Sequence, residues 1–257
     1  MTPPLPLALP PLLVEADALA VADQVAARLL EALACGRTLG LATGRTMEPV
    51  YRAFVARLKG LPSMERQRLI SGWSSFNLDE YVGLGSGDPQ SFAAFMQLHL
   101  GQPLDLPLGC LRLPDGRAAD PEAEAIRYAR SLQAAGGIGL QLLGLGSNGH
   151  VGFNEPPCQP EARCRCLSLS PSTRQQNAGA FGGDPQAVPT QAITLGLSEI
   201  LAAEALLLVV TGAEKAEILR RSLQEPPCPE VPASWLQGHP NLQVIADRSA
   251  ASTLLLS

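Results

Sequence analysis

Short apolar runs alternate with amphipathic stretches along most of this 257-residue chain. The runs RTLGLAT (37–43) and IGLQLLGLG (138–146) have the length of strands and predict buried strands. Residues 17–34 instead repeat apolar side chains near a helical period, and Leu19 is counted on their apolar face. Strands that alternate with helices typically form a parallel sheet covered by helices. The alternation therefore predicts a single α/β domain over residues 1–257, with three layers and a mostly parallel sheet.

The remaining stretches extend this pattern. We expect further helices over residues 47–59, 89–100 and 120–135, and a last one that begins near Ala213. We expect further strands over residues 68–82, 191–195, 205–211 and 242–247. Residues 156–188 are rich in Pro, Gly, Gln and Cys and weak in periodicity, which predicts a long loop. Long loops inside compact domains are often lids over a site, and we expect a lid here.

The composition disfavours several classes of protein. The net charge is −5 and aromatic residues make up 4%, which argues against nucleic acid or an acidic membrane surface as partner. No run of 18 apolar residues is present, and the apolar N-terminal stretch lacks the positive charge of an export signal. We therefore expect a cytoplasmic protein whose six cysteines are free thiols. The run CQPEARCRC (158–166) lacks the paired cysteine spacing and the histidine of a metal clip, so we expect no metal.

Three polar motifs follow predicted strands, namely ATGRT (42–46), FNLDEY (76–81) and GLGSNGHVGFNE (144–155). The carboxyl ends of parallel strands meet at one edge of a sheet, where α/β proteins bind their ligands. This shared position is a functional signal that depends on no known relative. We expect the three motifs to line one site.

The second and third motifs hold the candidate catalytic groups. Asp79 and Glu80 are adjacent, and neighbouring strand residues point to opposite faces, so only one carboxylate should enter a cleft. That carboxylate can act as a general base, although a pair of solvated acids explains the same letters. His150 lies in a glycine-rich loop and titrates near neutral pH, with Glu155 as a carboxylate that can orient its ring. Asn148 is a further hydrogen-bonding group for the ring or for a ligand.

The candidate anion site combines the first motif with two cations. In ATGRT a helix begins directly after a glycine, and backbone N–H groups at such a helix start suit a phosphate. Thr43, Gly44 and Thr46 are the candidates there, with an ordinary capped turn as the alternative. Arg174 follows a Ser/Thr-rich turn, and Lys215, one of only two lysines, lies where the last helix begins. A lysine there opposes the helix dipole, which an anionic ligand would explain.

With these motifs assembled, the sequence resembles the glucosamine-6-phosphate deaminases, within a larger group that includes the 6-phosphogluconolactonases. The resemblance runs from about residue 12 to about residue 250. It is carried by the motifs LGLATGRT, SSFNLDEYVGL, SFAAFMQLHL, LLGLGSNGHVGFNEP, STR, TGAEKA and SWLQGHPNLQVIAD. The lactonases lack the F-N-E-P continuation after their own Gly-His. The resemblance is therefore more specific for the deaminases.

The resemblance implies a Rossmann-like three-layer α/β/α sandwich and the conversion of glucosamine 6-phosphate and water to fructose 6-phosphate and ammonia. It assigns to Asp79 the proton transfer between C2 and C1 of the open-chain sugar. It assigns to His150 the opening of the sugar ring, with Glu155 as its carboxylate partner. No metal or organic cofactor is implied. The positions that match the phosphate site of the family are Thr43, Gly44, Thr46, Arg174 and Lys215.

Several positions depart from familiar members of the family. Asn148 stands where some members have Asp, so His150 should depend more on Glu155. Arg45 replaces a residue that is usually small, and we expect it to add a phosphate contact or to narrow the sugar pocket. Leu167 takes the place of a lysine that the allosteric hexamers use. We therefore expect a monomer or small homo-oligomer that N-acetylglucosamine 6-phosphate does not activate.

Three alternatives remain open at this point. A galactosamine-6-phosphate deaminase differs only at the C4 hydroxyl of the substrate. A 6-phosphogluconolactonase needs no C–H proton transfer by Asp79. A non-catalytic sugar-phosphate-binding protein needs only the phosphate site, and the joint presence of Asp79, His150 and Glu155 argues against it.

Overall fold

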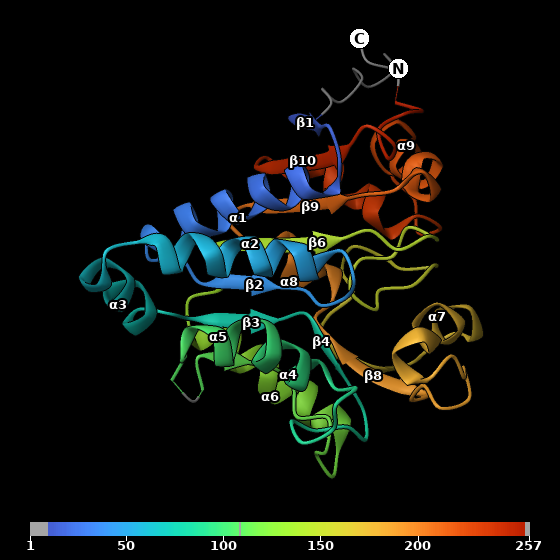
Figure 1. Cartoon of the computed structure of the whole chain (residues 1–257). Helices are drawn as coiled ribbons and strands as arrows, with labels where there is room; N and C mark the ends of the chain where they lie inside the picture. Colours follow the sequence, from blue (N-terminus) through green and yellow to red (C-terminus); the bar gives the residue numbers. More distant parts are fainter. Residues whose placement is uncertain (1–9, 108, 255–257) are drawn as a thin grey trace.

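The computed structural model describes residues 10–107 and 109–254. The strands of its main sheet are β1 (Leu12–Glu15), β2 (Leu39–Leu41), β3 (Ser75–Asn77), β5 (Leu111–Arg112), β6 (Leu140–Gly144), β9 (Leu206–Val210) and β10 (Leu242–Asp247). They lie in the order β1-β10-β9-β6-β2-β3-β5, and every neighbouring pair is parallel (Figure 1). All residues of β2, β3 and β9 are buried, because helices cover the sheet. The predicted α/β fold with a mostly parallel sheet is confirmed.

The helices lie on both faces of this sheet. Figure 1 shows α1 and α2 side by side in front of it and α8 behind it. The helices are α1 (Ala18–Ala34), α2 (Met47–Gly60), α3 (Ser63–Ser71), α4 (Phe92–Met96), α5 (Gln102–Leu104), α6 (Pro121–Ala134), α7 (Pro171–Asn177), α8 (Leu197–Leu201) and α9 (Ala216–Gln224). Among the described residues, no helix is both long enough and apolar enough to span a membrane.

Helix α1 shows why the pattern folds this way. Asp17 caps its first turn by accepting the backbone N–H groups of residues 19 and 20, each at 2.9 Å. Val21, Val25 and Leu29 are buried against the sheet, as predicted. Leu19 was expected on the same face, but it is 70% exposed. Two residues turn a helix by about 200°, so Leu19 points away from Val21.

A second, antiparallel sheet extends beyond the end of β3. Its strands are β4 (Asp79–Tyr81), β8 (Gln191–Thr194) and β7 (Arg165–Ser168), in the order β4-β8-β7. Figure 1 shows β4 and β8 past the carboxyl end of β3. Only Leu78 separates β3 from β4, and its N–H donates to Leu41 while its carbonyl accepts from Leu195. The chain therefore leaves the main sheet directly before Asp79.

The single strand expected over residues 68–82 is wrong. Residues 68–71 complete α3, which ends at Gly72, and the rest divides into β3 and β4 in two different sheets. The apolar run that suggested a strand contains Leu69 and Trp73, and both side chains are buried. Leu69 lies near the end of α3, and Trp73 lies in the turn that follows it. A short apolar run does not distinguish these cases by periodicity.

Two other expectations need correction, and two strands were not expected. Residues 89–100 form α4 and then a π-helical turn (Gln97–Gly101), and the helical path continues through α5. Residues 156–188 are not one irregular loop, because they contain β7, α7 and a 3₁₀ turn (Ala178–Phe181). Ser170 and Pro171, an N-cap and a first-turn proline, are the sequence signals for α7. The short edge strands β1 and β5 were not predicted, and the first nine residues of the N-terminal stretch lie outside the described residues.

Candidate active site

Most of the predicted site residues come directly after four neighbouring strands of the main sheet. In the main sheet β9, β6, β2 and β3 lie next to one another and run parallel, so their carboxyl ends share one edge. The loop after β2 holds Thr43–Thr46, β3 leads to Asp79, the loop after β6 holds His150, and β9 leads to Lys215. The sheet order thus brings the predicted motifs to one edge.

Asp79 is the carboxylate that faces the β6 loop. Its side chain is buried, and a Cβ added to Gly152 of that loop would lie 3.4 Å from its Oδ2 atom. Burial, with a smaller contribution from the charge of Glu80, raises the pKa of Asp79 to about 8. A carboxyl group with such a pKa takes and returns protons near neutral pH. It therefore suits a general base that also donates.

Glu80 points the other way and has a structural role. Its carboxylate accepts the backbone N–H groups of Tyr81 (2.8 Å), Phe92 (3.0 Å) and Ala93 (2.8 Å), and so holds the first turn of α4. Burial raises its pKa to about 7, although these three hydrogen bonds lower it. The prediction that only one of the two acids enters the site agrees with this arrangement.

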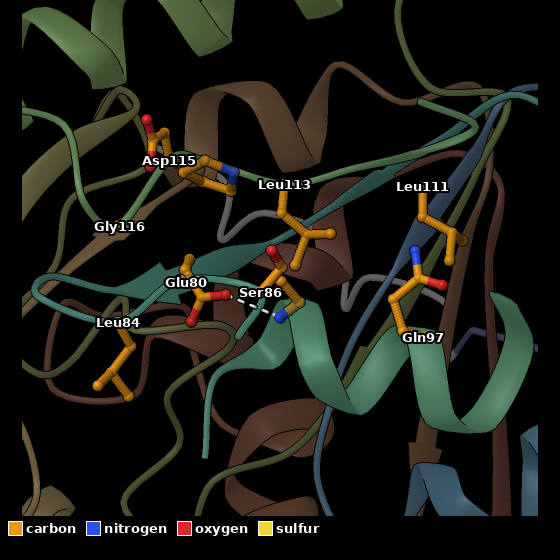
Figure 2. A pocket seen from close by; sticks show the side chains of 11 residues that line it. Glu80, Leu84, Ser86, Gln97, Leu111, Leu113, Asp115 and Gly116 are labelled. Carbon is orange, nitrogen blue, oxygen red and sulfur yellow. Dashed lines mark hydrogen bonds between the residues drawn. The ribbon is translucent and has the colours of Figure 1, made fainter. Parts of the chain in front are cut away.

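Beside Glu80 lies a cavity of about 240 Å³ (Figure 2). Gln97, Leu111, Leu113 and Asp115 also line it, and Figure 2 shows these side chains around the start of the helical segment that Glu80 holds. None of the predicted catalytic or phosphate-binding residues lines this cavity. The cavity is therefore not where the predicted site residues meet.

His150 is held as a neutral ring. Its Nδ1 atom lies 2.7 Å from the side-chain oxygen of Asn148, and its backbone N–H donates to the same oxygen at 3.2 Å. An amide oxygen only accepts, so Nδ1 carries the proton and Nε2 remains a proton acceptor. The pKa of His150 is lowered to about 4, chiefly by burial and in part by the charge of Lys215, while the charge of Glu155 raises it. The ring packs against Gly146, where an added Cβ would collide with it.

Glu155 hydrogen-bonds to the segment over residues 156–188 and not to the ring. Its Oε2 atom accepts the backbone N–H of Ser170, the N-cap of α7, at 3.2 Å, and its Oε1 atom is buried without a hydrogen bond. Its effect on His150 is electrostatic, across space. Asn148, which was expected as a hydrogen-bonding group for the ring, makes that hydrogen bond. The greater dependence of His150 on Glu155 stays a prediction.

The loop after β2 is shaped for an anion. Gly44 has φ +110°, which side chains rarely adopt, and its carbonyl accepts the N–H of Met47 at 2.9 Å as α2 begins. The buried Tyr51 hydroxyl donates to Ala42 at 2.5 Å and fixes the start of the loop. Thr46 is the N-cap of α2, yet its side chain makes no capping hydrogen bond, which leaves the hydroxyl for a ligand.

Lys215 and Arg45 are close enough to affect each other. Lys215 lies in a 3₁₀ turn (Ala213–Lys215) before α9 and is half-buried. Burial lowers its pKa, Glu214 opposes this, and the charge of Arg45 lowers it again. Among the ion pairs between described residues, none includes Lys215, Arg45 or Arg174. Neighbouring cations without a carboxylate partner favour an anionic ligand.

Arg174 lies on α7, within residues 156–188, and its guanidinium forms hydrogen bonds inside the same segment. It donates to the backbone carbonyls of Val188 and Gln186, each at 3.1 Å. Among the described residues, no hydrogen bond or ion pair joins it to Lys215 or to the loop after β2. The same helix α7 reaches the β6 loop through Gln176, whose side chain donates to Ser147 at 2.5 Å. The structure therefore places Arg174 on a helix that hydrogen-bonds to the His150 loop.

Three residues that hold the loop from His150 to Glu155 in place were not singled out in the sequence. Asn154, Thr194 and Arg165 hydrogen-bond to the loop that runs from His150 to Glu155 or lie within it. Asn154 belongs to the N-E-P motif, which was a signal. Thr194 and Arg165 carry no local signal, because strand pairing alone brings them to the site. In the described part of the chain, no group of three or more His, Cys, Asp or Glu residues could hold a metal ion.

Known proteins resemble this chain in sequence and in structure. Residues 14–245 match a family described as glucosamine-6-phosphate isomerases/6-phosphogluconolactonase. A glucosamine-6-phosphate deaminase from Geobacillus sp. (strain WCH70) is 43% identical over 83% of this chain and 83% of its own. Glucosamine-6-phosphate deaminase 2 from Bacillus subtilis (strain 168) is 40% identical over 84% of this chain and 85% of its own.

Solved structures agree with the sequence relatives. The structure of a monomeric glucosamine-6-phosphate deaminase superposes with a TM-score of 0.87 at 33% identity, over 95% of this chain and all of that one. A 6-phosphogluconolactonase from Trypanosoma cruzi superposes with a TM-score of 0.78 at 18% identity, over 98% of this chain and 99% of its own, which shows a shared fold. The sequence match and the fold together show that this chain belongs to the glucosamine-6-phosphate isomerase/6-phosphogluconolactonase family.

Proposed function

We propose that this protein is a glucosamine-6-phosphate deaminase, which converts glucosamine 6-phosphate and water to fructose 6-phosphate and ammonia. The observation that carries the proposal is the buried Asp79 against the His150 loop, with a pKa raised to about 8. A reaction that moves a proton between two carbons needs such a base in a site that excludes water. The named relatives at 40–43% identity support the same activity.

The proposed mechanism begins with ring opening. Nε2 of the neutral His150 accepts the proton of the C1 hydroxyl and passes it to the ring oxygen as the bond between that oxygen and C1 breaks. Asn148 keeps the ring in the required tautomer through the 2.7 Å contact at Nδ1. Glu155 favours the imidazolium that forms for a moment, because it is the one carboxylate that raises the pKa of His150.

Isomerisation and hydrolysis follow. The Asp79 carboxylate takes the proton from C2 and returns it to C1. A proton of the C2 amino group passes to the C1 carbonyl oxygen at the same time, which leaves a hydroxyl at C1 and an imine at C2. Water adds to that imine and ammonia leaves, so that the C2 carbonyl of fructose 6-phosphate remains. No redox step occurs, and every proton removed by Asp79 is given back. The site therefore needs no cofactor for this reaction.

The phosphate of the substrate is proposed to bind at the start of α2. The backbone N–H groups around Gly44, the hydroxyls of Thr43 and Thr46, and the charges of Lys215 and Arg45 suit a dianion. Arg174 would join this site from the lid segment, residues 156–188, once substrate is bound. We propose that this segment closes over the sugar.

A substrate panel tests the proposed function. Ammonia release is measured with glucosamine 6-phosphate and with galactosamine 6-phosphate, and lactone hydrolysis with 6-phosphogluconolactone. We expect ammonia from the glucosamine compound at the highest kcat/KM. Hydrolysis of the lactone without ammonia from either amino sugar would overturn the proposal, and a preference for galactosamine 6-phosphate would correct the sugar.

We also propose that the enzyme is a cytoplasmic monomer without allosteric activation. The relative at TM-score 0.87 is described as monomeric. Leu167, on β7, takes the place of the lysine that the resemblance assigns to the allosteric hexamers. We expect one species near 27 kDa in sedimentation and a hyperbolic rate curve. A sigmoidal curve that N-acetylglucosamine 6-phosphate abolishes would contradict this prediction.

A further inference from the structure

Three side chains form a row across the small antiparallel sheet. Thr194 on the central strand β8 pairs with Asp79 on β4 and with Arg165 on β7. Residues directly opposite one another in an antiparallel sheet project from the same face. Asp79, Thr194 and Arg165 therefore share one face, and we call them the cross-strand row. Thr194 is fully buried, and Arg165 is half-buried at the sheet edge.

Three consecutive residues of the β6 loop lie on this row, one on each member. Gly152 lies against Asp79 and Thr194, since a Cβ added to it would be 3.4 Å from Oδ2 and 3.1 Å from Oγ1. The N–H of Phe153 donates to Oγ1 of Thr194 at 3.3 Å. The guanidinium of Arg165 donates to the side-chain oxygen of Asn154 at 3.0 Å. Hydrogen bonds thus hold Phe153 and Asn154 on the row, and Gly152 lies against it without one.

The buried amide of Asn154 ties the same loop to Leu78. Its NH₂ group donates to Val151 at 3.0 Å and to the carbonyl of Leu195 at 2.9 Å. The N–H of Leu195 donates to Leu78 at 2.7 Å, and Leu78 directly precedes Asp79. The backbone of Leu195 therefore links Leu78, directly before Asp79, to the side chain of Asn154, directly before Glu155.

We propose that Thr194 and Arg165 are positioning residues that set His150 and Glu155 relative to Asp79. This inference rests on the proposed deaminase function, in which ring opening uses one end of the loop and proton transfer uses Asp79. The hydroxyl of Thr194 accepts from Phe153 and donates to Leu195, so both of its hydrogen-bonding roles are used inside the protein. Neither residue needs to touch substrate. Each acts through the loop that it holds.

The proposal predicts a kinetic signature. Replacing Thr194 by Val keeps the volume but leaves the buried N–H of Phe153 without an acceptor, so the loop shifts to satisfy it. A displacement of about 1 Å in a catalytic group can lower the rate about a hundredfold. Among the described residues, no hydrogen bond joins the loop after β2 to the cross-strand row. We therefore expect Thr194→Val to lower kcat about tenfold to a hundredfold, with KM nearly unchanged.

The test compares Thr194→Val with Thr194→Ser, which keeps Oγ, in the ammonia assay with glucosamine 6-phosphate. We expect Ser to restore kcat to near the wild-type value. Thr38→Val is the matched control, since Thr38 hydrogen-bonds to Ser74 at the amino end of β2, and it should leave kcat unchanged. A merely structural role would lower the Tm of the Val variant without changing kcat per folded molecule. That result, or an equal loss in both Thr194 variants, would overturn the proposal.

Arg165 supplies a second pair should Thr194→Val not fold. Arg165→Met removes the donor to Asn154 from an edge strand, and Arg165→Lys keeps one donor. We expect kcat to fall in the Met variant and to recover in part in the Lys variant. A wild-type kcat in Arg165→Met would overturn the role of Arg165. If the wild type itself releases no ammonia, the proposed function fails first, and this inference fails with it.

Discussion

At the scale of single residues, burial moves two ionisable groups in opposite directions. The pKa of Asp79 is raised to about 8 and that of His150 is lowered to about 4. One cause explains both, because a site that excludes water disfavours the carboxylate and the imidazolium alike. Near pH 7 the site therefore holds a neutral His150 and an Asp79 close to its titration point. This is the pair that the proposed reaction requires, an acceptor for a hydroxyl proton and a carboxyl group that gives its proton back.

The raised pKa of Asp79 predicts a stability change. The folded protein keeps this proton up to about pH 8, whereas the unfolded chain releases it near pH 3.8. As pH rises through this window the unfolded state binds fewer protons, so the free energy of unfolding decreases. Asp79→Asn lacks this titration, so its Tm should exceed that of the wild type by a margin that grows from pH 5 to pH 8. Calorimetry across that range measures the margin. A margin that is absent, or that does not depend on pH, would show that Asp79 is not desolvated.

At the scale of elements, the loop after β6 explains why glycines surround His150. Gly149 has φ +86° and Gly152 has φ +57°, values that side chains rarely adopt, and Gly146 packs against the His150 ring. The loop therefore turns tightly, returns to the small sheet, and leaves no room for a side chain under the imidazole. The position of His150 depends on these backbone features as much as on its hydrogen bond to Asn148.

Gly146→Ala tests the element directly. The new methyl group would collide with the His150 ring and push it from its place beside Asn148. We expect kcat to fall at least about tenfold while the protein remains folded, because the ring and not the core must move. Gly60→Ala is the control, since a Cβ at that helical position meets nothing within 4 Å. Steady-state kinetics with circular dichroism checks both variants. An unchanged kcat in Gly146→Ala would mean that the placement of His150 is not critical.

The elements also show how far sequence reasoning reaches. The parallel strands and long helices were predictable, because their apolar periodicity is local. The three polar motifs could be assigned to one edge, because a parallel sheet brings its carboxyl ends together. A strand was expected over residues 191–195, and it corresponds to β8. The small sheet was not predictable, since β4 pairs with β8 more than a hundred residues later and no local signal shows which strands pair. For the same reason Thr194 and Arg165 escaped notice, while Asp79 and His150 did not.

At the scale of the whole molecule, the net charge of −5 conceals a local positive site. Overall charge governs the binding of large polyanions, but a small dianion responds to the few groups around it. The strand order brings Lys215 after β9 to the same edge as Arg45 after β2, and Arg45 lowers the pKa of Lys215. Neither residue has a carboxylate partner among the described ion pairs. An acidic protein can therefore hold a phosphate in this site.

The two lysines of the chain offer a matched pair for testing that site. Lys215→Ala removes a charge-assisted hydrogen bond to the proposed phosphate, which corresponds to an increase in KM of about tenfold to a hundredfold. The change in kcat should be smaller, because the phosphate is bound equally before and during the reaction. Lys59→Ala, at an exposed position in the last turn of α2, should leave both constants unchanged. A loss confined to kcat in Lys215→Ala would place Lys215 at the reacting carbons instead.

Our central inference is that Asp79 transfers a proton in the deamination of glucosamine 6-phosphate. The most direct measurement is the ammonia formed from that substrate by the wild type and by Asp79→Asn, side by side. We predict one ammonia for each fructose 6-phosphate from the wild type. We predict a loss of about a hundredfold to ten-thousandfold in kcat for Asp79→Asn, the usual contribution of a positioned base. A wild type that releases no ammonia, or an Asp79→Asn variant that turns over at nearly the wild-type rate, would contradict it.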